Sequence, residues 1–495
     1  MATENSPKVK RRKGTKHDRT GCLTCRYRHK KCVENTFPEC GACMRLNLEC
    51  IREPKRQVAP AAQARAAKTR TEPAVSPVPT AQTLAFFHDY HHRTTLGSGR
   101  CSMRQYAMKY YVNVMTQLLT VSHQHNSFLS EFVPMALDSP ALSSALVSWA
   151  SGHLSTVDNR YRITALEARS TALSRLAEAI SCGSNDISVQ ETNAATSLVL
   201  LTSEVCLGNH AGWYDHLIGA KNIIKSAKVL ATTDDNMLVG PDALKGSVEG
   251  RWILRNFAYH DILGSVTLGT KPLLSPDYLH GITCVVDTYL GVASGILILM
   301  AEISCLGLGS KSETHTLPDN KEMNSKCSEI EQKLKAWQCH SDAAPALVAL
   351  GYAYRSAATI YLYRRMRSFV RFSTEYPSPA RRSELLGLLD FKIALETTAT
   401  LRHVAELPST EMTDSALLFP LFLAGGEATE TREINFVRQR LQLMLEKRHF
   451  QNIWRALSIL EEVWDRRLRK PNTPESDDAD WQDILASQSC RLLLT

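Results

Sequence analysis

The feature that most constrains the fold of this 495-residue chain is a set of six cysteines within its first fifty residues. Their spacing, C-x2-C-x6-C-x7-C-x2-C-x6-C, repeats one three-cysteine unit after 18 residues. Paired C-x2-C spacing is a strong zinc signal, and zinc in proteins prefers four tetrahedral ligands. The predicted metal ligands are Cys22, Cys25, Cys32, Cys40, Cys43 and Cys50.

The number of ligands indicates two zinc ions that share two of the thiolates. Two tetrahedral ions need eight ligand positions, and six cysteines fill them only if two cysteines bridge. The symmetry of the repeat makes the first cysteine of each unit, Cys22 and Cys40, the natural bridging pair. A single zinc on the two C-x2-C pairs is an alternative, but it leaves Cys32 and Cys50 without a role. A disulfide framework is another, disfavoured because the sequence shows no apolar signal-peptide segment and intracellular thiols stay reduced.

The positive charge of the chain is concentrated around these cysteines. Residues 1–56 hold 15 Lys and Arg against 6 Asp and Glu, which gives a net charge of +9. The whole chain carries +8, so the remaining residues, with 43 basic and 44 acidic side chains, sum to −1. This asymmetry indicates a polyanionic partner, with nucleic acid as the first expectation.

The segment between the second and third cysteines combines the charge with the metal ligands. We expect a short helix here, made rigid by zinc because the segment is too short for a hydrophobic core of its own. In the DNA major groove, its side chains could reach base edges while flanking cations contact phosphates. The candidate DNA-binding residues are Arg26, Arg28, His29, Lys30 and Lys31.

The run GCLTCRYRHKKC at residues 21–32, with PECGAC at 38–43 and Cys50, resembles the fungal binuclear zinc cluster DNA-binding domain. The resemblance implies that Arg28 and His29 read a CGG-type triplet and that Arg26 and Lys31 contact phosphate. His29 stands where the family commonly has lysine, and histidine carries no fixed charge at neutral pH. The resemblance to this family further implies one zinc on Cys22, Cys25, Cys32 and Cys40, and a second on Cys22, Cys40, Cys43 and Cys50.

Two segments flank the predicted cluster at residues 21–53. We expect the basic tail at residues 1–20 to be disordered. Its basic residues are typical of a nuclear localisation signal or, alternatively, of an arm that contacts DNA phosphates. Residues 54–83 are rich in Pro and Ala and predict a linker. They contain no heptad pattern, so either the protein binds DNA as a monomer or its body dimerises. The proposed localisation signal is Lys8, Lys10, Arg11, Arg12 and Lys13.

Residues 84–495 predict a large all-α body, so the expected fold class is mostly α behind a small zinc cluster. One helical stripe joins Leu166, Leu173, Leu176 and Ile180, and a second joins Ile453, Trp454, Leu457, Leu460 and Trp464. The stretches 227–250 and 308–326 look irregular. The apolar run at 290–301 predicts a buried helix, because a membrane span needs about 20 apolar residues. We therefore expect no membrane association.

Four motifs of this body resemble the fungal-specific transcription factor domain. They lie at residues 132–142, 208–220, 419–425 and 481–483. The resemblance implies an all-α regulatory region that modulates activity or mediates association. It leaves open a homodimer, a transcription co-regulator or a small-molecule effector as further partners.

Other candidate sites are weak. His88, His91 and His92 share a helical face without a neighbouring acid or thiol, so we expect ordinary histidines. No catalytic motif is present, and we predict no enzyme. The acidic segment 475–485 resembles an activation segment, but a packed C-terminal helix explains it equally well. The eight remaining cysteines are predicted to be buried thiols: Cys101, Cys182, Cys206, Cys284, Cys305, Cys327, Cys339 and Cys490.

Two functional hypotheses follow. The first is a nuclear transcription regulator that binds double-stranded DNA sequence-specifically through a two-zinc head, with output controlled by the helical body. The alternative is a zinc-dependent interaction or scaffold protein whose head binds acidic partners or RNA non-specifically. Sequence-specific binding in rising salt distinguishes them.

Overall fold

The computed structural model divides into two compact units, Met1–Ser76 and Pro77–Thr495. In the first unit the described residues are 32, 40–45 and 50, with one helix, α2 (Gly41–Arg45). In the second they are 102–208, 212–230, 237–283, 286–306, 320–339, 342–372, 378–409, 412–469 and 480–495.

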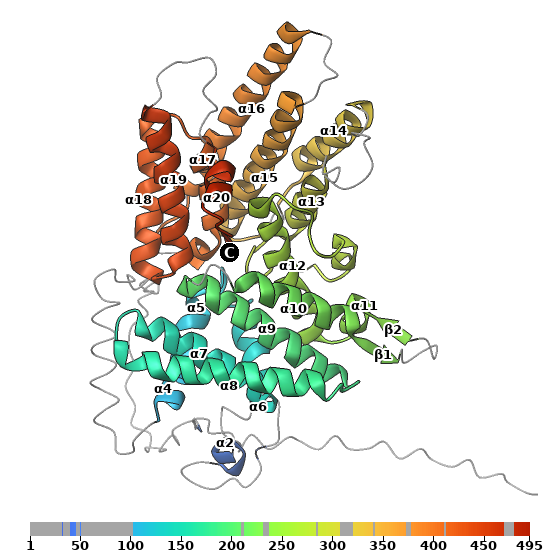
Figure 1. Cartoon of the computed structure of the whole chain (residues 1–495), viewed down its shortest axis with the longest axis vertical. Coiled ribbons are helices and arrows are strands. Elements are labelled where there is room, and N and C mark those ends of the chain that lie inside the picture. Colours follow the sequence, from blue (N-terminus) through green and yellow to red (C-terminus); the bar gives the residue numbers. More distant parts are fainter. Residues whose placement is uncertain are drawn as a thin grey trace, which may run out of the picture. The chain divides into compact units, whose positions relative to one another are not determined.

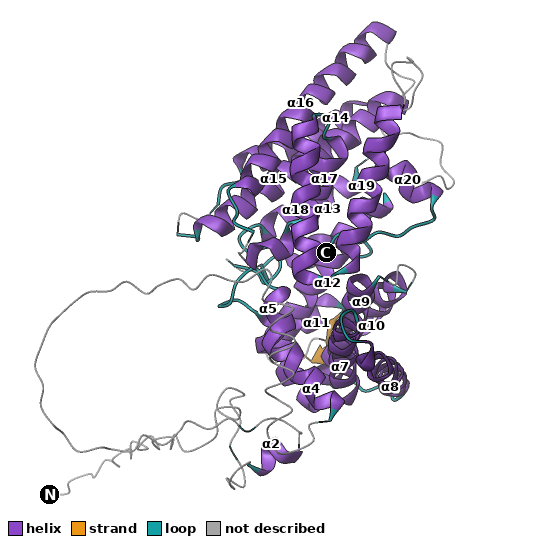
Figure 2. Cartoon of the chain, turned by 90° about the vertical axis from the view of Figure 1, so that its left-hand side faces the viewer, coloured by secondary structure: helices purple, strands orange, loops and turns teal. Residues whose placement is uncertain are grey.

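The second unit is built from two tiers of helices, which lie one above the other in both side views (Figures 1 and 2). The first tier is α4 (Met103–Tyr110), α5 (Thr116–Leu118), α6 (Val133–Asp138), α7 (Pro140–Ser155), α8 (Arg162–Ser181), α9 (Ile187–Leu207), α10 (Trp213–Ser226) and α11 (Pro241–Leu244). The second tier is α13 (Ser294–Cys305), α14 (Asn320–Ala336), α15 (Pro345–Phe372), α16 (Pro379–Ala405), α17 (Leu418–Glu427), α18 (Thr431–Arg448), α19 (Gln451–Arg469) and α20 (Trp481–Ser487). Short turns of π or 3-10 helix lie at Tyr111–Met115, Phe128–Phe132, Asn159–Tyr161, Pro276–Leu279 and Met412–Ala416. The mostly α prediction is confirmed.

Helix α12 (Val248–Leu268) joins the tiers, since it contacts α9 in the first and α13 in the second. It is buried along almost its whole length, and this includes polar side chains such as Asn256, His260 and Asp261. Its ends follow from local chemistry. The Ser247 hydroxyl caps the first turn by accepting the Gly250 N–H at 2.8 Å, and Gly269 ends the helix with a left-handed φ of 65°.

The stretch expected to be irregular at 227–250 contains regular structure. Strands β1 (Lys228–Leu230) and β2 (Met237–Val239) pair antiparallel, with Lys228 opposite Val239. Helix α11 follows, and α12 begins at Val248. The strands have only three residues each, too few for a clear alternating pattern. In the other stretch, residues 307–319 lie outside the described residues and α14 begins at Asn320.

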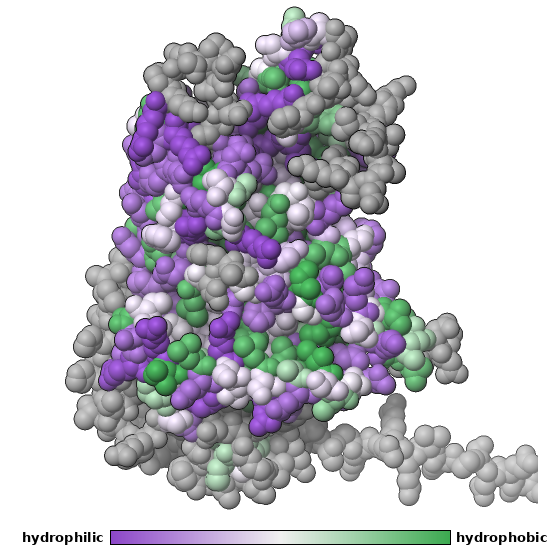
Figure 3. Space-filling view, viewed as in Figure 1, coloured by the Kyte–Doolittle hydropathy of each residue, from purple (hydrophilic) through white to green (hydrophobic). Residues whose placement is uncertain are grey.

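The two predicted apolar stripes have different outcomes. On α19, Ile453, Leu460 and Trp464 are buried as expected, although Trp454 is 47% exposed. On α8 the predicted helix is present, but its stripe largely faces outward. Leu166, Leu173 and Ile180 are 54%, 38% and 50% exposed, whereas Leu176 is buried with Ala168 and Ala172. Figure 3 shows green, apolar residues at the surface of the first tier where α8 crosses it.

The reason lies in the size of the side chains between α8 and α7. The buried residues of α8 include Ala168 and Ala172, and the small Ser148 of α7 donates its hydroxyl to the Ala165 carbonyl at 3.0 Å. Small side chains allow the two helices to approach closely. The orientation of α8 that permits this close packing is the one observed, and its larger apolar face stays exposed. Helical periodicity alone could not identify this choice.

A matched pair of substitutions tests this orientation of α8. We expect Leu176→Ala to lower the free energy of unfolding by about 2–3 kcal/mol, because it opens a cavity beside a buried position. Leu173→Ala should change it by less than about 0.5 kcal/mol, since the side chain is exposed. Denaturant unfolding followed by tryptophan fluorescence measures both. Equal losses would contradict the orientation.

Two smaller predictions are also settled or corrected. The buried helix expected at 290–301 begins later, at Ser294, and runs to Cys305. Among the described residues, no helix is both long enough and apolar enough to span a membrane.

The cysteines expected to be buried have mixed outcomes. Cys206 and Cys327 are buried, and Cys339 and Cys490 are partly buried. Cys182 and Cys305 are exposed because they lie at helix ends. Cys101 and Cys284 lie outside the described residues, as do His88, His91 and His92.

The chain's last described segment, 480–495, is packed into the body. Trp481 is fully buried against Phe422, and Leu492, Leu493 and Leu494 are buried as well. The Arg364 guanidinium lies 4.8 Å from the Trp481 ring centre and donates to both Asp480 carboxylate oxygens at 2.8 Å. Of the two interpretations of 475–485, the packed helix therefore describes residues 480–485, while 475–479 lie outside the described residues.

Candidate metal centre

The first unit brings three of the predicted zinc ligands together. The Sγ atoms of Cys40, Cys43 and Cys50 all lie within 4.8 Å of one another. Cys40 and Cys43 are fully buried, and the partly buried Cys32 packs against them. In this unit the described buried residues are thus largely thiol-bearing, which is typical of a domain held by metal and not by a hydrophobic core.

Helix α2 explains how the chain positions two of these side chains. The Cys40 carbonyl accepts the Met44 N–H at 2.9 Å, so the helix starts directly after this cysteine. A spacing of three residues then places Cys40 and Cys43 on the same side of one helical turn. Met44 points away and is 59% exposed.

Backbone N–H groups point at the sulfur atoms. The Cys40 N–H donates to the Cys50 Sγ at 3.2 Å, and the Cys43 N–H donates to the Cys40 Sγ at 3.4 Å. Hydrogen bonds of this kind favour the thiolate, which is the form that binds metal. They also orient the ligands, as outer-shell donors do in metal sites.

The donor set fits zinc. Sulfur atoms bound to one tetrahedral zinc at about 2.3 Å lie about 3.8 Å apart. Separations within 4.8 Å for three thiols therefore require only small side-chain adjustments. Cys40, Cys43 and Cys50 are three of the four ligands expected for one ion, and Cys32 belongs to the expected ligands of the other.

The remaining predicted residues lie outside the described part of the chain. These are Cys22, Cys25, the candidate DNA-binding residues Arg26, Arg28, His29, Lys30 and Lys31, and the proposed localisation signal at residues 8–13. The structure therefore tests neither their positions nor the bridging role of Cys22.

Sequence reasoning missed a second cluster, in the helical body. Arg440, Lys447 and Arg448 on α18 surround the buried Asp414. In the sequence, Lys447 and Arg448 look like the exposed cations that commonly end a helix. The sequence signal for this cluster was Asp414 itself, a carboxylate within a short, otherwise uncharged segment. A single carboxylate does not identify the cations that surround it.

Comparisons with known proteins agree with both units. Residues 20–58 match the fungal Zn(2)-Cys(6) binuclear cluster domain, and residues 105–495 match the fungal specific transcription factor domain. The binuclear cluster domain binds two zinc ions, as the cysteine spacing predicts.

One similar curated protein is the "Transcriptional activator protein UGA3" of Saccharomyces cerevisiae. It is 26% identical over 298 residues, which cover 50% of this chain and 54% of the relative, so the match spans about half the length of each. No solved structure matches. With the zinc cluster domain matched at residues 20–58 and the transcription factor domain matched at residues 105–495, the chain belongs to the fungal binuclear zinc cluster transcription factors.

Proposed function

We propose that this protein is a nuclear, sequence-specific DNA-binding transcription regulator. The observation that carries the proposal is the convergence of Cys40, Cys43 and Cys50 within a segment that holds the chain's entire positive excess. A metal centre makes such a segment rigid, and the charge attracts it to a polyanion. The name of the yeast relative, a transcriptional activator, supports the same class of function.

The six cysteines would hold two zinc ions, with Cys22 and Cys40 shared between them. Zinc supplies structural cross-linking here, since thiolates fill every ligand position and none is left open for a substrate. We accordingly assign no catalytic role to the chain. The domain limits that we propose are a tail at 1–20, the cluster at 21–53, a linker at 54–83 and the regulatory body at 84–495.

The segment between Cys25 and Cys32 would contact DNA. Arg28 and His29 are proposed to read a CGG-like triplet in the major groove, where guanine presents its N7 and O6 acceptors. Arg26, Lys30 and Lys31 would contact phosphates and thereby fix the orientation. The basic residues at 8–13 would direct nuclear import.

The helical body would control the output of the bound head. Homodimerisation through the body, a co-regulator and a small-molecule effector are each compatible with a large all-α regulatory domain. A selection of bound sequences from random duplexes, made with the full-length chain, tests the DNA-binding proposal. Enrichment of one CGG-containing site, or of two at fixed spacing, is expected, and the number of sites reports a monomer or a dimer.

Two substitutions separate base contacts from phosphate contacts. We expect Arg28→Ala to cost about 1–3 kcal/mol on the selected site and to blunt its preference over scrambled DNA. Lys31→Ala should weaken all duplexes alike and reduce the salt dependence of binding by about one counterion. Fluorescence anisotropy at several salt concentrations measures both.

The wild-type protein provides the decisive comparison. Equal affinity for the selected and the scrambled duplex at every salt concentration would support the scaffold hypothesis instead. An unchanged preference in Arg28→Ala would remove this residue from the set that reads bases.

A further inference from the structure

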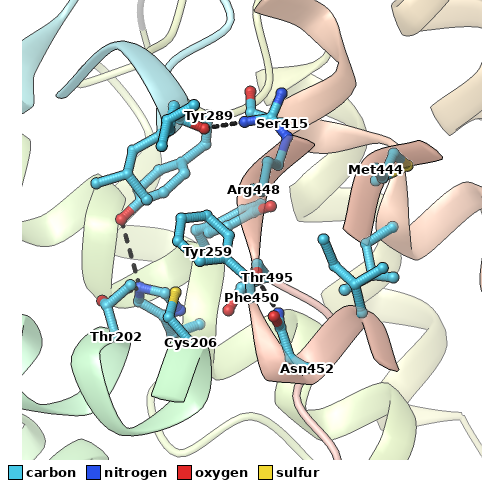
Figure 4. A pocket seen from close by; sticks show the side chains of 15 residues that line it. Thr202, Cys206, Tyr259, Tyr289, Ser415, Met444, Arg448, Phe450, Asn452 and Thr495 are labelled. Atoms are coloured by element: carbon cyan, nitrogen blue, oxygen red, sulfur yellow. Dashed lines mark hydrogen bonds between the residues drawn. The ribbon is translucent and has the colours of Figure 1, made fainter. Parts of the chain in front are cut away.

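The helical body has little room for a ligand at the junction of its two tiers. The cavity there is lined by Thr202, Arg448 and Thr495, among others (Figure 4). About 30 Å³ of it is open to the centres of water-sized molecules, which is room for about two waters. A partner of this body is therefore expected at its surface.

Helix α8 presents a regular apolar face at that surface. Six exposed residues follow one another along α8 at spacings of three and four positions. These spacings are those of the a and d positions of a heptad repeat, through which paired helices interdigitate. Leu166, Leu173 and Ile180 occupy the three d positions, and Ile163 begins the a positions with 63% of its surface exposed. We name the six residues the α8 seam: Ile163, Leu166, Ser170, Leu173, Ala177 and Ile180.

The α8 seam is not the face that holds the helix on the body. That task falls to the buried Ala168, Ala172 and Leu176. Single exposed apolar side chains are normal on a protein surface. The seam, in contrast, extends from Ile163 to Ile180, about 26 Å along one helix axis. A continuous apolar row of this length indicates a docking surface for another helix.

Two charged residues flank the α8 seam without using their charges inside the chain. Arg162 and Glu167 are exposed, and neither forms an ion pair with any residue that the structure describes. The nearby Arg169, in contrast, is already paired with Glu204. The seam therefore has a free cation on one side and a free anion on the other.

These two charges are complementary to those of an identical helix. In heptad terms Arg162 is a g residue and Glu167 is the following e residue. When two helices pair in parallel, each g residue faces the e residue five positions later on the other helix, and such pairs set partner choice and orientation. A second copy of α8 would thus form the Arg162–Glu167 pair twice, once on each side of a twofold axis. An antiparallel pair would place g beside g and e beside e, and would leave both charges unused.

The β1–β2 hairpin extends the apolar surface beyond the end of α8. The Gln190 side chain connects the two, since it accepts the Lys228 N–H at 3.1 Å and donates to the Ser184 carbonyl at 3.2 Å. Val229 packs inward against the core, so its neighbours in the strand pairing lie on the outer face. Figure 3 shows apolar residues on one face of the molecule both along α8 and at the hairpin. The exposed residues of this outer face are Leu230, Met237 and Val239.

An exposed apolar stripe on α16 lacks such free charges. Asp390 beside it pairs with Arg367 at 3.1 Å. Lys392 pairs with Glu331 at 3.2 Å. The α8 seam differs from this stripe because its flanking charges have no partner among the described residues. The α16 stripe consists of Leu388, Phe391 and Leu395.

We propose that the α8 seam binds the α8 seam of a second copy of this chain, with the two helices parallel. The proposal rests on the proposed function, because a dimer of the body supplies two DNA-binding heads, and it names the surface that joins them. The linker at 54–83 has no heptad pattern of its own, so pairing falls to the body. Each d residue packs against the same residue of the second copy.

The size of the surface sets the expected strength of the dimer. The six seam residues and the three of the hairpin are fewer than the roughly 20–30 residues that each partner gives to a stable interface. We therefore expect a dimer that dissociates at roughly micromolar concentration. At such an affinity, binding of both heads to one DNA would strengthen the pairing.

Sedimentation velocity of the zinc-loaded full-length chain without DNA, from about 1 to 100 µM, tests the proposal. A concentration-dependent monomer–dimer equilibrium is expected. Leu166→Glu should raise the dimer dissociation constant at least about 100-fold, because it places two carboxylates opposite each other across the twofold axis. The matched control is Leu395→Glu, at a 60% exposed leucine of α16, and it should dimerise as the wild type does. A chain that stays monomeric, a Leu166→Glu dimer of wild-type affinity, or loss of dimerisation in the control would overturn the proposal.

Charge reversal tests the parallel arrangement. Arg162→Glu and Glu167→Arg should each weaken the dimer by about tenfold, since two ion pairs become two repulsions. The two substitutions together should restore the dissociation constant to within about threefold of the wild type. A double variant as weak as the single ones would contradict parallel pairing. Each variant should keep the wild-type unfolding midpoint at about 1 µM, where the monomer dominates, because these side chains are exposed.

DNA binding in the same preparation keeps the two proposals distinct. If the full-length chain binds its selected duplex specifically but stays monomeric, only the interface proposal fails. If it dimerises through α8 while all duplexes bind equally, the proposed function fails and the interface stands. On a duplex with two half-sites Leu166→Glu should lose at least about tenfold in affinity, with no change on a single half-site. Selection of a single half-site, or unchanged affinity for two, would refute the role of this interface on DNA.

Discussion

Cys40→Ser is expected to release both zinc ions and to reduce affinity for the selected duplex by about 1,000-fold or more, to the level of non-specific binding. Cys40 is fully buried and its Sγ lies within 4.8 Å of two other cysteine Sγ atoms. If it bridges the two ions, one substitution removes a ligand from each of them. Serine is a poor replacement because its hydroxyl does not ionise as a thiol does. Metal analysis by mass spectrometry, together with anisotropy, measures both effects.

Cys50→Ser is the matched comparison within the cluster. Cys50 is expected to bind one ion only, so this variant should keep more zinc than Cys40→Ser at the same chelator concentration. Cys182→Ser, at an exposed cysteine of the helical body, should keep two ions per chain and wild-type DNA affinity. Retention of two ions by Cys40→Ser would exclude the bridging assignment.

The fluorescence of the protein separates loss of the cluster from general unfolding. All seven tryptophans lie in the helical body, from Trp149 to Trp481. Their emission and the unfolding midpoint should therefore not change in Cys40→Ser. A body that unfolds with the cluster would indicate that the two units depend on each other.

Much of the metal centre could be predicted because its information is local. Cysteine spacing specifies ligand number, and ligand number specifies two ions, without knowledge of distant contacts. Cys40 and Cys43 illustrate this, since three residues of helix place their sulfur atoms together. The mostly α class was predictable for a similar reason, because helical periodicity extends over long segments.

Features that depend on distant contacts were not predictable. Which face of α8 is buried depends on its packing against α7, and the sequence pattern of α8 points to the other face. Arg448 lies in a last helical turn, where a cation is usually exposed, and it is buried here because segments more than two hundred residues away cover it. Periodicity reports the character of one element, whereas burial depends on its neighbours.

A second large effect is expected from pH, because two histidines are held neutral inside the body. Burial lowers the pKa of His153 to about 4 and that of His260 to about 3. The His153 ring lies between the Tyr110 hydroxyl, 2.9 Å from its Nδ1, and the Arg448 carbonyl, 2.7 Å from its Nε2. Such rings stay unprotonated in the folded protein at pH 5.

The direction of this pH effect follows from the number of protons that the folded and the unfolded chain bind. Below about pH 6.5 the unfolded chain protonates both histidines while the folded chain does not, so stability falls with pH down to the folded pKa values. Between pH 7 and pH 5 this costs about 2 kcal/mol for each histidine, about 4 kcal/mol together. Asp261 acts in the opposite direction, because burial raises its pKa to about 6 and the folded state then takes up the proton. This proton uptake stabilises the folded state by about 1.4 kcal/mol between pH 7 and pH 5. The net loss in the free energy of unfolding is therefore about 2–3 kcal/mol.

Urea unfolding at pH 7 and pH 5, followed by tryptophan emission, should show this loss. His153→Gln and His260→Gln should each remove about 2 kcal/mol of the difference between the two pH values, whatever their effect at pH 7. In the double variant most of the loss should disappear, because Asp261, Glu131 and Glu191, whose pKa values burial raises, then oppose His403 and His449, whose pKa values burial lowers. The exposed His123, replaced by Gln, is the control that should leave the difference unchanged. A double variant that loses as much stability at pH 5 as the wild type would mean that other groups control the acid sensitivity of the body.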